Sequence, residues 1–422
     1  MLNINEVDID TVSTISQSNE TLKVKVRLKS DPDVVCPLCK GPVIKNGFIS
    51  RKLTHSTLAN RKCFIIYERR RYLCKDCDFS FSENNPFINT SESVTLETKI
   101  NVLKDLKKVN NTYSSTAERF NLSTTKVQRI FDRSVQIKRK PLPEILSIDE
   151  HYFPESNYDS LYICIFMDFN TGTIIDVLPD RKKHYVSQYL NDIRNSTLDI
   201  HNKSELSNVK YVSIDLYENY RDLAHIYFPA AKVCADSFHV LENLTKYFHN
   251  IRLRCRRNTK DEDIQYLLSK FKFIFNHGIN LDNVPKYNKR FKRYMNYRDI
   301  MNILFDHFPD LKDAYLLKEA YIDFNSTSSY EKARAELTDM IRMFADSDIR
   351  EYDEFYNMLV NWFEEIVNSF IIVNGRRINN SYIESRNNQI EHLIYNARGF
   401  INFERTRNRI LYCLNKEDTY KI

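Results

Sequence analysis

Two Cys-x-x-Cys pairs near the N-terminus constrain the fold of this chain more than any other feature of its sequence. A two-residue spacer lets both thiolates of a pair reach one ion, so two pairs can hold one tetrahedral Zn²⁺. A redox dithiol and unconnected buried cysteines are the alternatives, but two pairs together favour zinc. Strand-like residues 48–53 and 64–72 lie between the pairs, which predicts a zinc ribbon. Its ligands are Cys36, Cys39, Cys74 and Cys77.

The other cysteines and the N-terminus indicate where such a protein works. The chain begins with an acidic segment that lacks the basic and apolar regions of a signal peptide. No apolar stretch approaches the ~20 residues that a membrane-spanning helix needs. We therefore expect a soluble intracellular protein whose nine cysteines are thiols or metal ligands. Cys63 lies between the two pairs and is expected to be a packed thiol.

The segment between the two cysteine pairs is strongly basic. Residues 36–77 contain ten Lys or Arg and two acidic residues, although the whole chain carries only +6. A solvated face is the ordinary explanation for a charge run, but this density on a metal-bound module favours contact with phosphates. The candidate DNA-binding residues are Arg69, Arg70 and Arg71.

Three helical segments follow the ribbon. Thr95 is the expected N-cap of the first helix, and Ser123 is the expected N-cap of the third, at 124–135. Segment 114–120 precedes that third helix, and this order is typical of a helix-turn-helix, although generic helical packing is the alternative. Residues 97–140 contain eleven basic and four acidic residues. The exposed face of the third helix offers to a major groove Thr125, Lys126, Gln128, Arg129 and Arg133.

After a basic linker, the apolar pattern becomes strand-like and carries acidic residues at strand ends. The expected strands are 145–152, 160–169, 173–178, 209–214 and 231–235, with helices at 184–194 and 218–228. Three antiparallel strands followed by alternating helices and strands are the order of an RNase H-like fold, whose first and fourth strands lie side by side. Asp149 in the first strand and Asp215 after the fourth should therefore face each other.

Such paired carboxylates suit divalent-ion chemistry on phosphates. Hard oxygen ligands bind Mg²⁺, and two ions about 4 Å apart can hold the attacking and leaving oxygens of a phosphodiester. A third carboxylate is required from a later helix, and Glu384 is the candidate.

The sequence resembles the DDE transposases of bacterial insertion sequences, specifically the ISL-three type with an N-terminal zinc ribbon. The resemblance implies that Asp149, Asp215 and Glu384 form a triad that binds two Mg²⁺ or Mn²⁺ ions. It also implies terminal inverted repeats and target DNA as partners, and a homodimer in the DNA complex. The matching residues are 36–39, 69–77, 147–150, 213–215, 220–221, 228–231, 233–240, 380–390, 397–400, 402–403 and 405–411.

Further residues enter through the same resemblance. Asp236-x-x-His239 is similar to an acid-x-x-His signature of several transposases, which implies a supporting role, with a structural role as the alternative. Asn387 and Asn388 lie about one turn beyond Glu384, and Asn388 is expected to support the site. Glu391 departs from the family, which often has a basic residue there.

The fold class expected is a multidomain α+β protein in which an all-helical insertion domain interrupts the RNase H-like mixed-sheet core. Two basic-aromatic runs in the insert, 246–257 and 286–294, could contact unpaired bases or belong to ordinary amphipathic helices. Trp362 is expected to pack in the core. The expected domains are 1–90 (zinc ribbon), 91–140 (helix-turn-helix), 141–240 (core, first part), 241–376 (insertion) and 377–422 (core, final helices).

These features predict a DNA transposase that recognises its element ends and catalyses strand cleavage and strand transfer. A non-catalytic DNA-binding regulator derived from a transposase is one alternative, and a nuclease of the same fold that does not join strands is another. The regulator would not need three acids, so their joint presence favours an enzyme.

Overall fold

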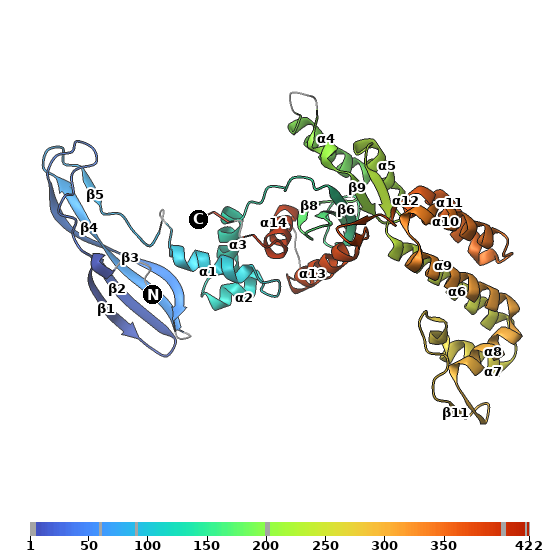
Figure 1. The fold of residues 1–422 in the computed structure, drawn as a ribbon. Helices are drawn as coiled ribbons and strands as arrows, with labels where there is room; N and C mark the ends of the chain where they lie inside the picture. The colour runs from blue at the N-terminus through green and yellow to red at the C-terminus, as the bar shows by residue number, and fades with distance from the viewer. Residues whose placement is uncertain are drawn as a thin grey trace. The chain divides into compact units, whose positions relative to one another are not determined.

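The computed structural model describes residues 6–58, 61–88, 92–198, 203–397, 402–417 and 420–421. The chain forms two compact units (Figure 1). Unit 1 comprises Met1–Lys138 with Asn388–Ile422, and unit 2 comprises Arg139–Asn387. Within the described ranges, no helix has both the length and the apolar character needed to cross a bilayer. The five expected domains remain a prediction. The two units differ from them at the C-terminus, where residues 388–422 belong to unit 1.

A five-stranded sheet forms the N-terminal part of unit 1. Its strand order is β1-β2-β4-β3, with β5 paired to β4, and only the β2–β4 pairing is parallel. The expected pairing of 48–53 with 64–72 is confirmed, because Leu53 lies opposite Ile65. The first two strands were not predicted. The strands are β1 Ile9–Gln17, β2 Thr21–Leu28, β3 Val43–Leu58, β4 Arg61–Cys74 and β5 Ser80–Ser82.

Helices α1 Leu96–Leu106, α2 Tyr113–Arg119 and α3 Thr124–Ser134 follow the sheet. Both expected N-caps are confirmed, since Thr95 accepts from the amide of Thr98 and Ser123 from that of Lys126. The turn between α2 and α3 passes through Asn121, whose φ of 54° lies in the left-handed region that asparagine tolerates.

The C-terminal helix α14, Phe403–Leu414, packs on these three helices within unit 1. Its Tyr412 hydroxyl donates to the carbonyl of Leu103 at 2.9 Å. Arg405 donates two hydrogen bonds to the carboxylate of Asp132, at 2.8 and 2.6 Å. These contacts explain why residues 388–422 belong to unit 1 rather than to the unit that contains the second sheet.

A second five-stranded sheet organises unit 2. Its order is β10-β9-β6-β7-β8, in which β6, β7 and β8 are antiparallel and β9 and β10 run parallel to β6. Strand β8 is buried along its whole length. The expected neighbourhood of the first and fourth strands is confirmed, because β6 pairs with β9. The elements are β6 Ile145–Tyr152, β7 Tyr162–Asp168, β8 Ile174–Leu178, α4 Lys183–Ser196, β9 Tyr211–Ile214, α5 Glu218–Tyr227 and β10 Lys232–Ala235.

The segment after β10 is mainly helical, and its core continues that of the sheet. Ile214 in β9 belongs to the same buried cluster as Leu244, Leu268 and Tyr352. Trp362 is 3% exposed, as expected for a core residue. The helices are α6 Ser237–Asn258, α7 Glu262–Lys270, α8 Tyr297–His307, α9 Pro309–Thr327, α10 Tyr330–Ala345, α11 Asp353–Asn361, α12 Phe363–Asn368 and, continuing into unit 1, α13 Ser381–Ala397.

The expectation of an all-helical insertion is wrong in two places, because two hairpins interrupt the helices. The basic-aromatic run 286–294 lies on a hairpin of β11 Lys286–Asn288 and β12 Arg293–Met295 rather than on a helix. The Asn288 side chain accepts from the amide of Arg290, and Lys292 has a φ of 51°, so local turn chemistry overrides helix propensity. A second short hairpin, β13 Ile372–Val373 with β14 Arg376–Arg377, precedes α13.

Candidate metal centres

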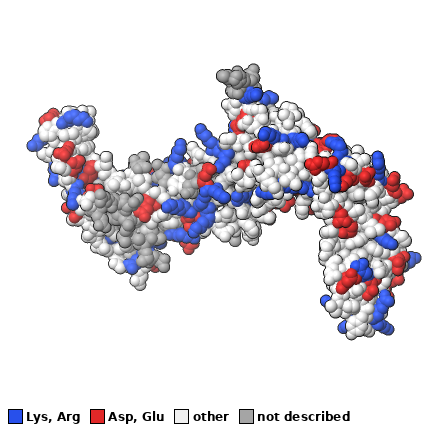
Figure 2. All heavy atoms as spheres, in the orientation of Figure 1, with Lys and Arg blue, Asp and Glu red and all other residues white. Residues whose placement is uncertain are grey.

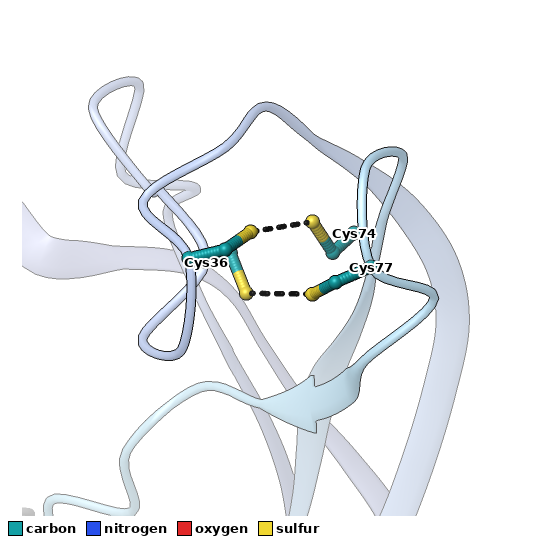
Figure 3. Close-up of side chains that lie close together, drawn as sticks. Cys36, Cys74 and Cys77 are labelled. Carbon is teal, nitrogen blue, oxygen red and sulfur yellow. Dashed lines mark hydrogen bonds between the residues drawn. The ribbon is translucent and has the colours of Figure 1, made fainter.

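The four predicted cysteine ligands lie together in unit 1 (Figure 3). All four sulfurs are within 4.8 Å of one another. Cys36 and Cys77 Sγ are 3.7 Å apart, and Cys39 and Cys74 Sγ are 3.4 Å apart. A tetrahedral Zn²⁺ with bonds of about 2.3 Å places its sulfurs about 3.8 Å apart. The donor set and its spacing therefore fit a zinc ion.

The two cysteine pairs are built by the same backbone device. The amide of Cys36 donates to the carbonyl of Gly41, and the amide of Cys74 donates to that of Phe79, five residues later in each case. The turn closes through a left-handed residue, Lys40 at φ 63° or Asp78 at φ 56°. This repetition aims both pairs at one point. Cys63 is buried instead, which raises the pKa of its thiol, as expected for a packed residue.

Three neighbouring strands of unit 2 bring acidic residues together, one within a strand and two directly after a strand. Asp149 lies in β6, Asp215 directly follows β9, and Asp236 directly follows β10 as the N-cap of α6. Oxygens of Asp215 and Asp236 and a ring nitrogen of His239 lie within 4.8 Å of one another. Because β9 and β10 are parallel neighbours, their carboxyl ends meet at one edge of the sheet.

The carboxylates of this cluster repel one another. Asp149 is 6% exposed, and its burial and the charge of Asp215 raise its pKa to about 8. Burial and the charges of Asp236 and Asp215 also raise the pKa of Glu384, while His239 lowers it. Each predicted triad member is thus paired electrostatically with another acid of the cluster. A divalent cation among them would relieve both effects.

One face of α13 and the residue before it contacts the strand acids. Asn380, Glu384 and Asn387 follow one another at spacings of four and three, which places them on one side of a helix. Asn380 Nδ2 donates to Asp215 Oδ1 at 3.0 Å, and its Oδ1 accepts from Ser213 Oγ at 2.7 Å. Asn387 Nδ2 donates to Asp149 Oδ2 at 2.7 Å. The helix therefore orients both strand acids.

The structure changes the roles expected of the asparagines. Asn380, 1% exposed, was not predicted, and Asn388 is exposed. Asn387 and Asn388 lie three and four residues after Glu384, and both spacings are compatible with the same helix face. Asn380 could have been found from the sequence, because it lies four residues before Glu384.

Asp236 and His239 lie closer to the triad than a peripheral role suggests. His239 Nε2 is 3.2 Å from Asp215 Oδ1, and its Nδ1 is 3.2 Å from Glu242 Oε2. The hydrogen bond to Asp215, with the charges of Asp215 and Asp236, raises the pKa of His239 to about 10. A protonated His239 would balance part of the acidic charge of this cluster.

Two buried oxygens support a cation at this cluster. Within the described part of the chain, Asp236 Oδ2 and Asn387 Oδ1 have no hydrogen-bond partner. A buried acceptor without a donor costs free energy, and carboxylate and amide oxygens are ligands that Mg²⁺ and Mn²⁺ accept. The donor chemistry of the cluster therefore fits a hard divalent ion.

We expect alanine at Asn380 or Asn387 to weaken binding of Mn²⁺ by about 10–100-fold, because each amide fixes the orientation of a ligand carboxylate. Asn388→Ala is the matched control and should leave the affinity unchanged. Titration of the full chain with Mn²⁺, followed by calorimetry, measures these values. Equal losses in all three variants would contradict this positioning role.

The three arginines proposed for DNA have different surroundings. Arg70 is 5% exposed, pairs with Glu83 at 3.2 Å and donates to the carbonyl of Leu28 at 2.9 Å. Arg69 donates to the carbonyl of Glu83, and Arg71 is exposed. Arg70 is therefore corrected to a structural role, because its guanidinium is used within the sheet of unit 1.

The predicted recognition helix presents a mixed surface. Thr125, Arg129 and Arg133 are exposed, whereas Lys126 and Gln128 are half-buried. Arg133 lies 3.4 Å from Glu92 with 73% of its side chain accessible. Lys and Arg side chains gather over the helices of this unit in Figure 2. The motif residues 398–400 lie outside the described residues.

Comparison with known proteins gives one finding. A family model described as a transposase, of the DDE and ISL-three type, matches residues 146–410, which is more than half of the chain. No curated protein matches the chain. The matched range includes all of the acidic cluster and the asparagines that orient it.

Proposed function

The chain belongs to the ISL-three family of DDE transposases, and on that premise we propose that it binds the terminal inverted repeats of its insertion sequence and catalyses DNA strand cleavage and strand transfer. The observation that carries this proposal is the gathering of Asp215, Asp236 and His239 within 4.8 Å of one another, beside α13, which carries Glu384 and donates through Asn387 to Asp149. The strand order β10-β9-β6-β7-β8 supports an RNase H-like core.

In the proposed reaction Asp149, Asp215 and Glu384 would hold two Mg²⁺ or Mn²⁺ ions. When bound, such ions stabilise the charge that develops on the attacking and leaving oxygens of a phosphodiester. Asn380 and Asn387 fix the orientation of the carboxylates of Asp215 and Asp149, which would bind the ions. His239 holds a proton beside Asp215 and offers a positive charge at the edge of the site. Water would hydrolyse a phosphodiester at the element end and free a 3′-hydroxyl. This hydroxyl would attack a target phosphodiester, join to its phosphorus and displace a 3′-hydroxyl of the target strand.

DNA recognition is assigned to unit 1. The zinc ribbon and the helix-turn-helix carry the two basic segments, and the exposed residues of α3 suit a major groove. We retain Arg69 and Arg71 with Thr125, Lys126, Gln128, Arg129 and Arg133 as the proposed contacts. A homodimer would hold two element ends together, and the bacterial nucleoid is the proposed place of action.

Arg129→Gln is expected to weaken binding of element-end DNA and to reduce the slope of log affinity against log salt by about 0.9, because one phosphate contact is lost. Arg70→Gln should instead lower the stability of unit 1, since Arg70 is buried against Glu83. Fluorescence anisotropy across a salt series and thermal melting measure the two effects. An unchanged salt slope in Arg129→Gln would remove that residue from the interface.

Incubation of the protein with labelled element-end DNA and Mg²⁺ tests the proposed function. We expect cleavage at the end and, with a target duplex present, joined products. Binding without cleavage would favour a regulator that has lost catalysis. Cleavage without joined products would favour a nuclease of the same fold.

A further inference from the structure

One face of α6 leads away from the acidic cluster and carries an exposed aromatic ring. Phe238 lies two residues after Asp236 and is 54% exposed. It makes an edge contact with the His239 ring, with centroids 5.5 Å apart. Phe238, Leu241 and Thr245 line an open pocket of about 500 Å³, which Glu242, Lys246 and His249 complete. An apolar surface therefore begins directly beside the proposed reaction site.

A basic cavity of about 260 Å³ continues from this pocket. Thr245 and His249 line both, so the two spaces adjoin along the helix. Arg252, Lys272 and Lys318 contribute positive charge to the second cavity. Arg252 is 5% exposed and Lys318 is 2% exposed. Buried cations are costly in the absence of a partner of opposite charge.

Lys318 is ion-paired with Glu319, whereas Arg252 and Lys272 have no ion pair among the described residues. Arg252 donates to the carbonyl of Leu268 at 2.5 Å, and its Nε has no hydrogen-bond partner among the described residues. Lys318 Nζ donates to the carbonyl of Phe275 at 2.7 Å and also contacts Glu319. Burial and the charges of Arg252 and Lys272 lower the pKa of His249. The cavity is thus positive and suits an anion.

The separation between ring and cavity suits a short stretch of nucleic acid. Phe238 and Arg252 are fourteen residues apart on α6, which corresponds to about 21 Å along the helix axis. A strand with a rise of about 3.4 Å per nucleotide covers that distance in about six nucleotides. A single face therefore offers a stacking ring at one end and a phosphate-sized basic cavity at the other.

We propose that this face of α6 binds the DNA strand that runs away from the scissile phosphate, with an unpaired base stacked on Phe238 and a backbone phosphate in the basic cavity. The assignment of the scissile phosphate rests on the proposed function. A protein partner fits less well, because the apolar surface is small and ends in buried positive charge. Aromatic stacking with cationic backbone contacts is how single strands are commonly bound.

Binding of a fluorescein-labelled single-stranded oligothymidylate to the full chain, without divalent metal, provides the first test. Phe238→Ala should weaken binding about tenfold through lost stacking. Lys272→Gln should reduce the salt slope by about 0.7, as expected for one phosphate of a single strand. Phe273→Ala and Lys270→Gln are matched controls outside the pocket and the cavity, and should leave both values unchanged. Unchanged affinity in both test variants overturns the proposal.

Photocrosslinking of element-end DNA locates the base. 5-Iododeoxyuridine, placed in turn at the six positions beside the cleavage site, should crosslink to the peptide containing Phe238 at one of them, and Phe238→Ala should remove that product. Crosslinking without cleavage in Mg²⁺ would support this strand path and defeat the proposed chemistry. Cleavage with crosslinks only to other peptides would support the chemistry and overturn the strand path.

Discussion

Alanine at Asp215 is expected to lower the rate of strand cleavage by about a thousandfold, which corresponds to roughly 4 kcal/mol of transition-state stabilisation. Asp215 contacts two other residues of the cluster. Its Oδ1 accepts a hydrogen bond from Asn380 and lies 3.2 Å from His239 Nε2. Without this carboxylate, the remaining acids cannot hold an ion against the attacking and leaving oxygens. Asp149→Ala and Glu384→Ala should cause losses of similar size.

The control for these variants is Asp222→Ala. Asp222 is a half-exposed acid on α5 that pairs with Lys183 at 2.9 Å, so its loss removes one negative charge without touching the cluster. Cleavage rates with saturating Mg²⁺ and Mn²⁺ affinities should be measured for all four proteins. Triad variants that cleave within tenfold of the wild-type rate would defeat the catalytic assignment, whatever their metal affinity.

Serine at Cys74 is expected to remove zinc from the protein and to unfold the ribbon. Structural zinc contributes about 10–16 kcal/mol in small zinc modules, and this site brings four sulfurs within 4.8 Å of one another. The metal content should fall from about one zinc per chain to nearly none. The thermal transition of unit 1 should move to a lower temperature, because that sheet carries the cysteine pairs.

Cys63→Ala is the matched control for the zinc prediction. Cys63 lies in the same strand as Cys74 but is buried in the sheet and outside the four-sulfur cluster. It should retain one zinc per chain and lose only the small stability of a packed side chain. Wild-type protein without zinc, or equal zinc loss in both variants, would contradict the assignment.

Local signals in the sequence predicted much of the fold. Thr95 and Ser123 are side-chain caps whose geometry depends only on the following turn, and both caps form. The strand that carries Asp149 has the bounds expected from its apolar run. Such features can be predicted without distant residues, because periodicity and capping depend on residues only a few positions apart in the sequence.

Features that depend on distant partners were not predictable in this way. Strand β2 pairs in parallel with β4, and no local sequence pattern predicts that pairing. The burial of Arg70 depends on Glu83 and the carbonyl of Leu28, which come from two other segments. Residues 286–295 have the composition of an amphipathic helix, but they form a hairpin whose turn is stabilised by the Asn288 side chain.

The sequence by itself predicted the ligands of both candidate metal centres: four thiolates in two short turns, and three acids on strands and on a late helix. It named Asn388 as a supporting residue, although Asn387 and Asn388 are both compatible with the face of Glu384 by spacing alone. The tertiary structure decided this, because the path of α13 over the ends of β6 and β9 brings Asn380 and Asn387 to the carboxylates. The spacing of residues along a helix determines which of them share a face. Only the packing of the helix determines which residue of that face contacts a strand.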